Sequence, residues 1–361
     1  MRQDQPGSIA NHLSDMKAID LFPYWADNRR LLIEAARALR DEDLDIRPAP
    51  GLRSIGDVLR HLITAEEHWW HGGMQGSPYA HWRPPGWDHL SDEEKAARRG
   101  QRFPTIRSIL EGLSAAHAPV ERFLADLDAA DLCEKRRSTW GQDNTLRWIL
   151  WHLVEHDQHH RGQLYTRVRM LGRDIPQIWP RSQVMAWTPA ARWRDGEATI
   201  ADIVPFWGHV NATLREALAG LADDDLRFAP ASGLPTLHDL ALHLIISEDF
   251  VIRQGLGGDT ETPHGDIQSG WWRFDLSQLS QNVGRHFPTV ASLLAALDVV
   301  HAETRRIVGA LSIGDLARIV KTGPAPETIH HTLWYAREHT VHHRAQIFLR
   351  LRMLGRTPPE L

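Results

Sequence analysis

Cysteine is almost absent from this chain of 361 residues, and Cys133 is the single one. An intrachain disulfide and a cysteine-based metal cluster are therefore both excluded. Apolar runs are short, and none approaches the ~20 residues that a helix needs to span a bilayer. The N-terminal sequence MRQDQPGSIANHLSDMKAID lacks a basic start followed by an apolar stretch, so we expect no signal peptide. Together these absences predict a cytoplasmic protein.

A surplus of either charge is missing as well. Lys and Arg number 41 and Asp and Glu number 46, which gives a net charge of −5. Nucleic acids and anionic membranes are bound mainly through clusters of positive charge. We therefore expect neither a nucleic acid nor a membrane as a partner. What the chain has in excess is 22 histidines and 15 tryptophans, within a hydrophobic content of 42% that suffices for buried cores.

The chain is a tandem duplication. SIGDVLRHLITAEEHW, which starts at Ser54, matches TLHDLALHLIISEDFV, which starts at Thr236, at an offset of 182 residues. LWHLVEHDQHHRGQLYTRVRMLGR from Leu150 matches LWYAREHTVHHRAQIFLRLRMLGR from Leu333 at an offset of 183 residues. Segments that start at residues 21 and 103 recur with offsets of 182 and 184. Each copy is far longer than a solenoid repeat, so each is expected to form a domain with its own core.

Each copy contains four segments in which apolar residues recur at spacings of three and four, the period of an amphipathic helix. The predicted helices cover residues 15–40, 52–72, 104–127 and 143–171, and then 198–222, 235–254, 288–311 and 326–354. Stretches rich in proline, glycine or acidic residues separate them. We therefore predict an all-α fold of two tandem four-helix bundles, each an up-down bundle with one extended connection.

The predicted domain limits are residues 1–172 for the first bundle, 173–197 for a connector and 198–361 for the second bundle. The connector region contains three tryptophans, Trp179, Trp187 and Trp193. Such apolar content is costly to leave in water, so we expect the connector to pack against the domains. This predicts a pseudo-two-fold arrangement of the bundles and a monomer whose two copies form an intrachain pseudo-dimer.

Histidines mark a candidate metal site in each copy. His156 and His160 lie four residues apart on the fourth predicted helix, so one turn places both imidazoles on the same face. His61 lies in the middle of the second helix, within an apolar stripe where a polar ring needs a partner. Such a set can hold one divalent ion and leave a coordination position open, as in a reactive site. The second copy repeats the set as His243, His339 and His343.

A structural role for these histidines stays open on the residues alone. A histidine beside apolar helix residues is often a hydrogen-bonded core residue, and duplication copies structural residues too. His117 and His159 also recur, as His301 and His342, and the adjacent His159 and His160 cannot both face one ion.

Carboxylates and tryptophans near the predicted triads also have two interpretations each. Glu155 and Glu338 either lie on a solvated face or accept a hydrogen bond from a ligand imidazole. Four carboxylates beyond the second-helix histidines are expected at the surface, with a general base as the alternative: Glu66, Glu67, Glu248 and Asp249. Six tryptophans near domain ends and loops are expected to pack in cores or interfaces, with pocket walls as the alternative: Trp69, Trp70, Trp82, Trp87, Trp140 and Trp148.

His61 together with WHLVEHDQHHRGQL resembles the DinB/YfiT superfamily of metal-binding four-helix bundles. Its signature is a histidine in the second helix and a His-x-x-x-His followed by Arg-Gly-Gln in the fourth. Both copies match over nearly their full length, and Arg344-Ala345-Gln346 departs from Arg161-Gly162-Gln163 only at the glycine. The resemblance implies that both sets of three histidines are metal ligands, with one zinc or nickel ion per domain.

The superfamily includes metal-dependent transferases and isomerases that use low-molecular-weight thiols, such as mycothiol or bacillithiol, and hydrolase-like members. The resemblance therefore implies a divalent-metal-dependent enzyme, with thiol S-transfer to a small electrophilic molecule as the leading hypothesis. The alternatives are a metal-dependent hydrolase and a non-catalytic metal-binding stress-response module. A fourth protein ligand would favour the module, whereas apolar and aromatic side chains beside an open position would favour an enzyme.

Overall fold

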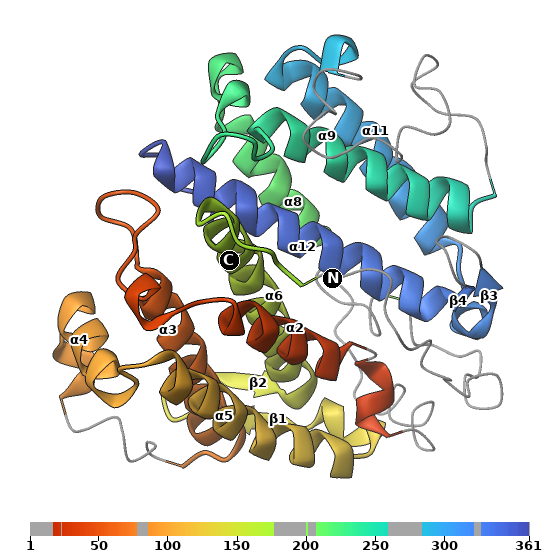
Figure 1. Cartoon of the computed structure of the whole chain (residues 1–361). Coiled ribbons are helices and arrows are strands. Elements are labelled where there is room, and N and C mark those ends of the chain that lie inside the picture. Colours follow the sequence, from red (N-terminus) through yellow and green to blue (C-terminus); the bar gives the residue numbers. More distant parts are fainter. Residues whose placement is uncertain are drawn as a thin grey trace. The chain divides into compact units, whose positions relative to one another are not determined.

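The computed structural model describes residues 17–22, 24–77, 86–176, 200, 207–258, 284–320 and 326–360. The chain divides into two compact units, residues 1–178 and 179–361 (Figure 1). Both units consist mainly of helices, with a short two-stranded sheet in each. The prediction of two all-α domains in tandem is confirmed.

Four long helices form the bundle of the first unit: α2 (Trp25–Arg37), α3 (Ile55–His68), α5 (Ile106–Asp126) and α6 (Leu146–Met170). A π-helical segment, η3 (Trp69–Met74), continues α3, and the shorter helix α4 (Asp92–Arg102) precedes α5. Strands β1 (Lys135–Arg137) and β2 (Asp143–Thr145) form an antiparallel hairpin between α5 and α6. Four 3-10 turns complete the unit: η1 (Ala18–Leu21), η2 (Asp41–Asp43), η4 (Trp87–His89) and η5 (Ala129–Cys133).

Each long helix of the first unit packs against two others. Helix α2 contacts α5 and α6, and α3 contacts the same two helices. Successive helices α2 and α3 therefore lie at opposite corners of the bundle, as do α5 and α6. The expected up-down order, in which successive helices are neighbours, is not observed, because the connections 38–54 and 127–145 are long enough to cross the end of the bundle.

The core of the first unit lies between these helices and is built from aliphatic side chains with few aromatic ones. It includes Leu32, Leu59, Ile63, Leu113 and Leu164, all of which are almost completely removed from water. Burying one such side chain contributes about 1.5–3 kcal/mol, so the register of α3 against α6 is set mainly by this core. That register decides which side chains of the two helices can meet.

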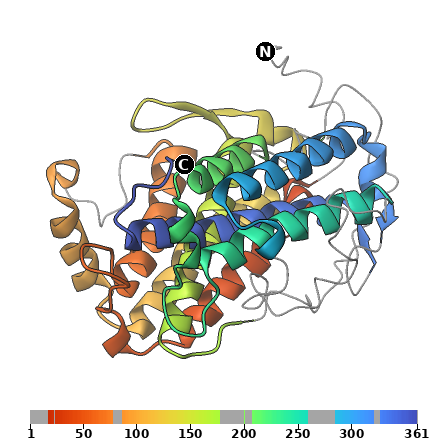
Figure 2. The same cartoon turned by 90° about the horizontal axis from the view of Figure 1, so that it is seen from above.

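The second unit repeats the plan with α8 (Trp207–Ala219), α9 (Leu237–Glu248), α11 (Val290–Gly309) and α12 (Ile329–Met353). The π-helical segment η7 (Asp249–Leu256) continues α9, and strands β3 (Ile319–Val320) and β4 (Glu327–Thr328) precede α12. Its 3-10 turns are η6 (Asp223–Arg227), η10 (Gly284–His286) and η11 (Gly314–Ala317). Helices α8 and α9 each contact α11 and α12, and the four run side by side in both views (Figure 1, Figure 2). The duplicated sequence thus folds into two copies of one bundle.

Hydroxyl side chains fix the starts of the helices that carry the histidines. Ser54 and Thr145 cap α3 and α6, and Thr236 and Thr328 cap α9 and α12. Each hydroxyl oxygen accepts a backbone N–H of the first turn, a contact that typically contributes ~1 kcal/mol. The first residues of the two helices that meet at each triad are therefore defined in the same way in both copies.

Some expectations fall outside the described residues. Most of the predicted connector, with its three tryptophans, and Trp82 lie there. The two units are described one at a time, so the pseudo-two-fold arrangement and the intrachain pairing stay predictions. In the described part of the chain, no helix combines the length and apolar character needed to cross a membrane.

Candidate metal centres

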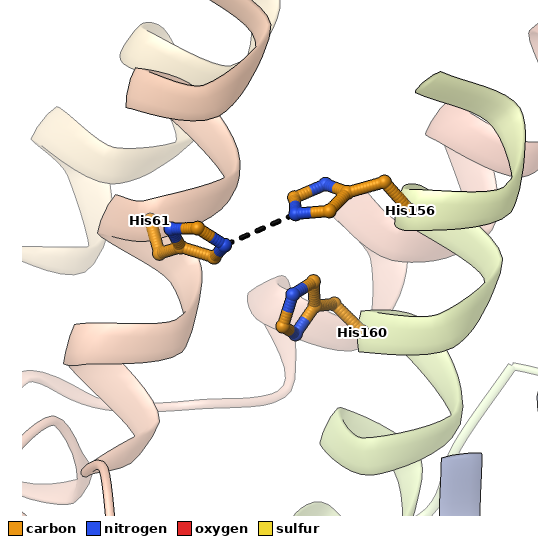
Figure 3. A group of neighbouring side chains, drawn as sticks. All are labelled: His61, His156 and His160. Carbon is orange, nitrogen blue, oxygen red and sulfur yellow. Dashed lines mark hydrogen bonds between the residues drawn. The ribbon is translucent and has the colours of Figure 1, made fainter. Parts of the chain in front are cut away.

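In the first unit, three imidazoles converge from two helices. His61 extends from α3, and His156 and His160 extend from successive turns of α6 (Figure 3). The Nε2 atoms of His61 and His156 lie 3.0 Å apart. One ring nitrogen from each histidine lies within 4.8 Å of the other two. The structure thus brings together the three histidines that the sequence analysis had proposed as ligands.

The second unit contains the same arrangement. His243 extends from α9, and His339 and His343 extend from α12, with their candidate ligand nitrogens again within 4.8 Å of one another. The Nε2 atoms of His243 and His339 lie 2.8 Å apart. Neither group includes a fourth His, Cys, Asp or Glu side chain in the part of the chain that the structure describes.

Burial keeps these imidazoles neutral. It lowers the pKa of His61 to about 3, with smaller contributions from the charges of Arg53 and Arg99. Burial also lowers the pKa of His339 to about 4. The pKa values of His156 and His160 lie well below the ordinary value for the same reason, and neighbouring histidines lower them further. Neutral rings present the lone pairs that a metal ion requires.

The geometry fits one ion per triad. Two imidazole nitrogens bound to one tetrahedral ion at ~2.0–2.1 Å are separated by about 3.3 Å. The separations of 3.0 Å and 2.8 Å are already close to that value, so a small outward shift of the rings accommodates an ion. The donors, neutral nitrogens without cysteine sulfur, suit a first-row divalent transition metal.

In the second unit, a glutamine supports one of the candidate ligand histidines from behind. His343 donates its Nδ1–H to Oε1 of Gln346 at 3.0 Å, and Nε2 of Gln346 donates to Nε2 of His342 at 3.1 Å. The first bond leaves Nε2 of His343 free of a proton and directed at the triad. In the first unit, Gln163 donates to His159 in the same way, at 2.8 Å. This explains the recurrence of His159 and His342, which orient the glutamine and do not face the ion.

A buried charge network lies next to the first triad and joins all four helices of its bundle. Arg29 of α2 forms ion pairs with Glu66 of α3 and, at 3.1 Å, with Asp157 of α6. His117 of α5 contacts the other oxygen of Glu66 at 2.7 Å. Burial raises the pKa of Glu66, but the charge of Arg29 and the contact with His117 outweigh it and hold the pKa below its usual range. Burial raises the pKa of Asp157, and Arg29 only partly opposes this.

In the second unit the corresponding glutamate contacts a histidine and uncharged side chains, with Nε2 of His301 3.4 Å from Glu248. Asn211 and Thr340 stand where the first unit has Arg29 and Asp157. Glu248, the counterpart of Glu66, accepts hydrogen bonds from Oγ1 of Thr304 at 2.7 Å and from Asn211 at 3.5 Å. The cation and one carboxylate have been replaced together, and Glu248 is the carboxylate that remains, held by Thr304, Asn211 and His301.

These contacts correct the interpretation of the nearby carboxylates. Glu66, Glu248 and Asp249 are buried, not at the surface, because each has partners inside the bundle. Arg253 neutralises Asp249 at 2.6 Å. Glu67 is partly exposed and pairs with Arg102 at 2.7 Å. A solvated face is wrong for Glu338 too, which is buried, whereas Glu155 is partly exposed.

The fold and the site define the class of this protein: each unit is a helical bundle in which three histidines form a candidate metal site. Sequence comparison gives the family. A model described as the DinB family matches residues 11–191, and one described as the DinB superfamily matches residues 208–347. The chain belongs to the DinB family and contains two of its domains in tandem, as the resemblance implied. No curated protein and no solved structure matched the chain.

The charge network predicts how substitutions at Arg29 behave. Arg29→Ala leaves two buried carboxylates without their cation and should lower the free energy of unfolding by about 3–5 kcal/mol. The double change Arg29→Asn with Asp157→Thr, which copies the second unit, removes both charges and should cost clearly less. Urea unfolding followed by circular dichroism measures both. The account of the network is contradicted if the double variant is as unstable as the single one.

The buried triads predict a pH dependence of the metal-free protein. Unfolded histidines take up protons below pH ~6.5, whereas the folded rings stay neutral down to much lower pH, to about 3 for His61. The unfolded state then binds more protons, so the free energy of unfolding should fall as the pH drops from 7 to 5. His61→Gln should make that fall shallower in urea titrations at both pH values. A stability that does not change over this range would show that the rings are not held neutral.

Proposed function

We propose that each unit binds one divalent transition-metal ion and that the protein is a metal-dependent thiol S-transferase, which joins the sulfur of a low-molecular-weight thiol to a small electrophile. The observation that supports the proposal most is the donor set of each triad. It consists of three neutral imidazoles and no fourth His, Cys, Asp or Glu side chain among the described residues. Three protein ligands are typical of catalytic sites, whereas structural sites usually have four.

When bound, the ion supplies positive charge that lowers the pKa of a thiol and so favours the thiolate at neutral pH. The protein holds this charge with imidazoles that stay neutral because they are buried. Gln346 keeps the Nδ1 proton of His343 away from the triad. In the proposed reaction the thiol sulfur forms a bond to an electrophilic carbon, the leaving group departs with its electron pair, and the thiol proton passes to solvent.

Thiol transfer is favoured over hydrolysis by the state of the nearby carboxylates. A hydrolase of this type needs a general base that can accept a proton from water. Arg29 and His117 occupy the oxygens of Glu66, and Thr304 and Asn211 hydrogen-bond to Glu248. Arg102 pairs with Glu67 through two hydrogen bonds. A thiol that ionises beside a cation needs no such base, because its own pKa lies near 8.5 before any shift.

The metal proposal predicts a stoichiometry. Purified protein reconstituted with zinc or nickel should contain two equivalents of metal, one per triad, by elemental analysis. His156→Ala should lose about one equivalent, His339→Ala the other, and the double variant both, because two imidazoles hold an ion far less tightly than three. Wild-type protein without stoichiometric metal after reconstitution would contradict the proposal.

The reaction class predicts a measurable activity. Metal-loaded protein should accelerate the reaction of bacillithiol, mycothiol or cysteine with 1-chloro-2,4-dinitrobenzene, followed by the absorbance of the thioether. The matched control is the double variant His156→Ala and His339→Ala, which should react at the uncatalysed rate. If the metal-loaded protein and the double variant give equal rates with all three thiols, S-transfer is excluded for this electrophile class.

A further inference from the structure

A group of partly exposed aromatic rings lies at one end of the first bundle. It consists of five residues that we call the aromatic cluster: His68, Trp69, Trp140, Trp148 and His152. They come from the end of α3, from η3, from the turn between β1 and β2, and from the start of α6. Three separate parts of the chain thus contribute to one surface.

The rings of the cluster contact one another directly. His68 stacks on Trp140 with centroids 4.2 Å apart, and Trp148 stacks on His152 at 5.2 Å with an interplanar angle of 5°. Trp69 lies between these two pairs and contacts Trp140, Trp148 and His152 at 5.0, 5.5 and 4.9 Å. The five side chains therefore form a continuous surface and not scattered exposed rings.

The aromatic cluster continues directly into the first metal triad. His152 lies one helical turn before His156 on α6, and the two ring centroids are 6.0 Å apart. All five rings are partly exposed, whereas Trp151 and Tyr165 on the same helix are buried in the bundle. A ligand that reaches the triad can therefore contact the aromatic cluster at the same time.

The bundle does not need this cluster to fold, as the second unit shows. Val251, Gly323 and His331 occupy the positions of Trp69, Trp140 and Trp148, whereas Phe250 and Tyr335 occupy those of His68 and His152. His331 is buried, and its ring hydrogen-bonds to Thr328 at 2.7 Å. Since the same fold forms without tryptophan at these three positions, packing of the bundle alone does not account for the three indole rings.

We propose that the aromatic cluster binds an uncharged planar aromatic group of the substrate and places the rest of that molecule at the first triad. Stacked and edge-to-face ring pairs contribute beyond the area that they bury, which favours a flat ring over an aliphatic group. Indole faces also attract cations, but a divalent ion at the triad would repel a cationic group this close. The inference rests on the proposed metal site and gives the two units different roles, with aromatic substrates handled by the first.

Two metal-chelating probes test this without knowledge of the substrate. Benzohydroxamate and acetohydroxamate carry the same chelating group and differ in a phenyl ring against a methyl group. The first site is isolated in the variant His339→Ala with His343→Ala, loaded with one equivalent of zinc, and the dissociation constants are measured by calorimetry. We expect the first site to bind benzohydroxamate about tenfold more tightly than acetohydroxamate. The second site, isolated in the variant His61→Ala with His156→Ala, should show a smaller ratio of the two dissociation constants.

Substitution with the residue of the second copy localises the effect. Trp69→Val in the isolated first site should reduce the preference for benzohydroxamate several-fold and leave acetohydroxamate binding and zinc content unchanged. Trp148→His is the second variant, for use if Trp69→Val loses its helical circular dichroism signal. An equal preference at both sites, or one unchanged by either folded variant, overturns the inference. If the isolated first site binds no zinc, the proposed metal function fails instead.

Discussion

The approach of two neutral imidazole nitrogens is the contact on which each unit depends. Nitrogens 3.0 Å and 2.8 Å apart share a hydrogen bond, in which one neutral ring donates its N–H to the lone pair of the other. Burial disfavours added protons on these rings, as the pKa of about 3 for His61 shows. The bundle therefore keeps these rings as neutral electron-pair donors in a low-dielectric space, where a cation can take the place of the shared proton. Rigid helices on both sides keep the rings from turning away.

The duplication shows which features the fold needs and which can vary. The helical plan, the caps and both triads are retained in the two copies. The buried ion pair of Arg29 with Asp157 has become Asn211 and Thr340, and the cluster around Trp69 has no counterpart of the same kind. Loss of a buried cation alone would be costly, so paired replacement is the route expected from electrostatics. The two sites have thus kept their ligands while their surroundings diverged.

Much of the fold and the triads could be predicted from the sequence. The predicted helix 104–127 coincides closely with α5, and 326–354 with α12, because apolar periodicity and proline-rich breakers are local signals. His156 and His160 were found because helical spacing alone places them on one face. Their proximity to His61 needed the additional expectation that two helices pack in register.

The rest depended on tertiary contacts that no local pattern records. Glu66 contacts Arg29 and His117 from two other helices, and Arg29 in turn contacts Asp157, so the sequence around Glu66 does not predict its burial. The first predicted helix, 15–40, begins too early, since α2 starts at Trp25. Gln163 and Gln346 follow the candidate ligand histidines in the sequence. Their hydrogen bonds to His159 and His342 could not be predicted from it, because they depend on side-chain positions in the folded helix. The arrangement of the helices around the bundle was predicted wrongly, because the long connections allow successive helices to lie either side by side or at opposite corners.

X-ray absorption spectroscopy of the zinc-loaded protein tests the central claim most directly, since it reports the atoms bound to the ion. The account predicts three imidazole nitrogens per ion at about 2.0–2.1 Å, with the outer-ring scattering that imidazole gives. His156→Ala and His339→Ala together should abolish this spectrum. A spectrum without imidazole scattering, or one with a shell of carboxylate oxygens in its place, would contradict the assignment of the triads as metal sites.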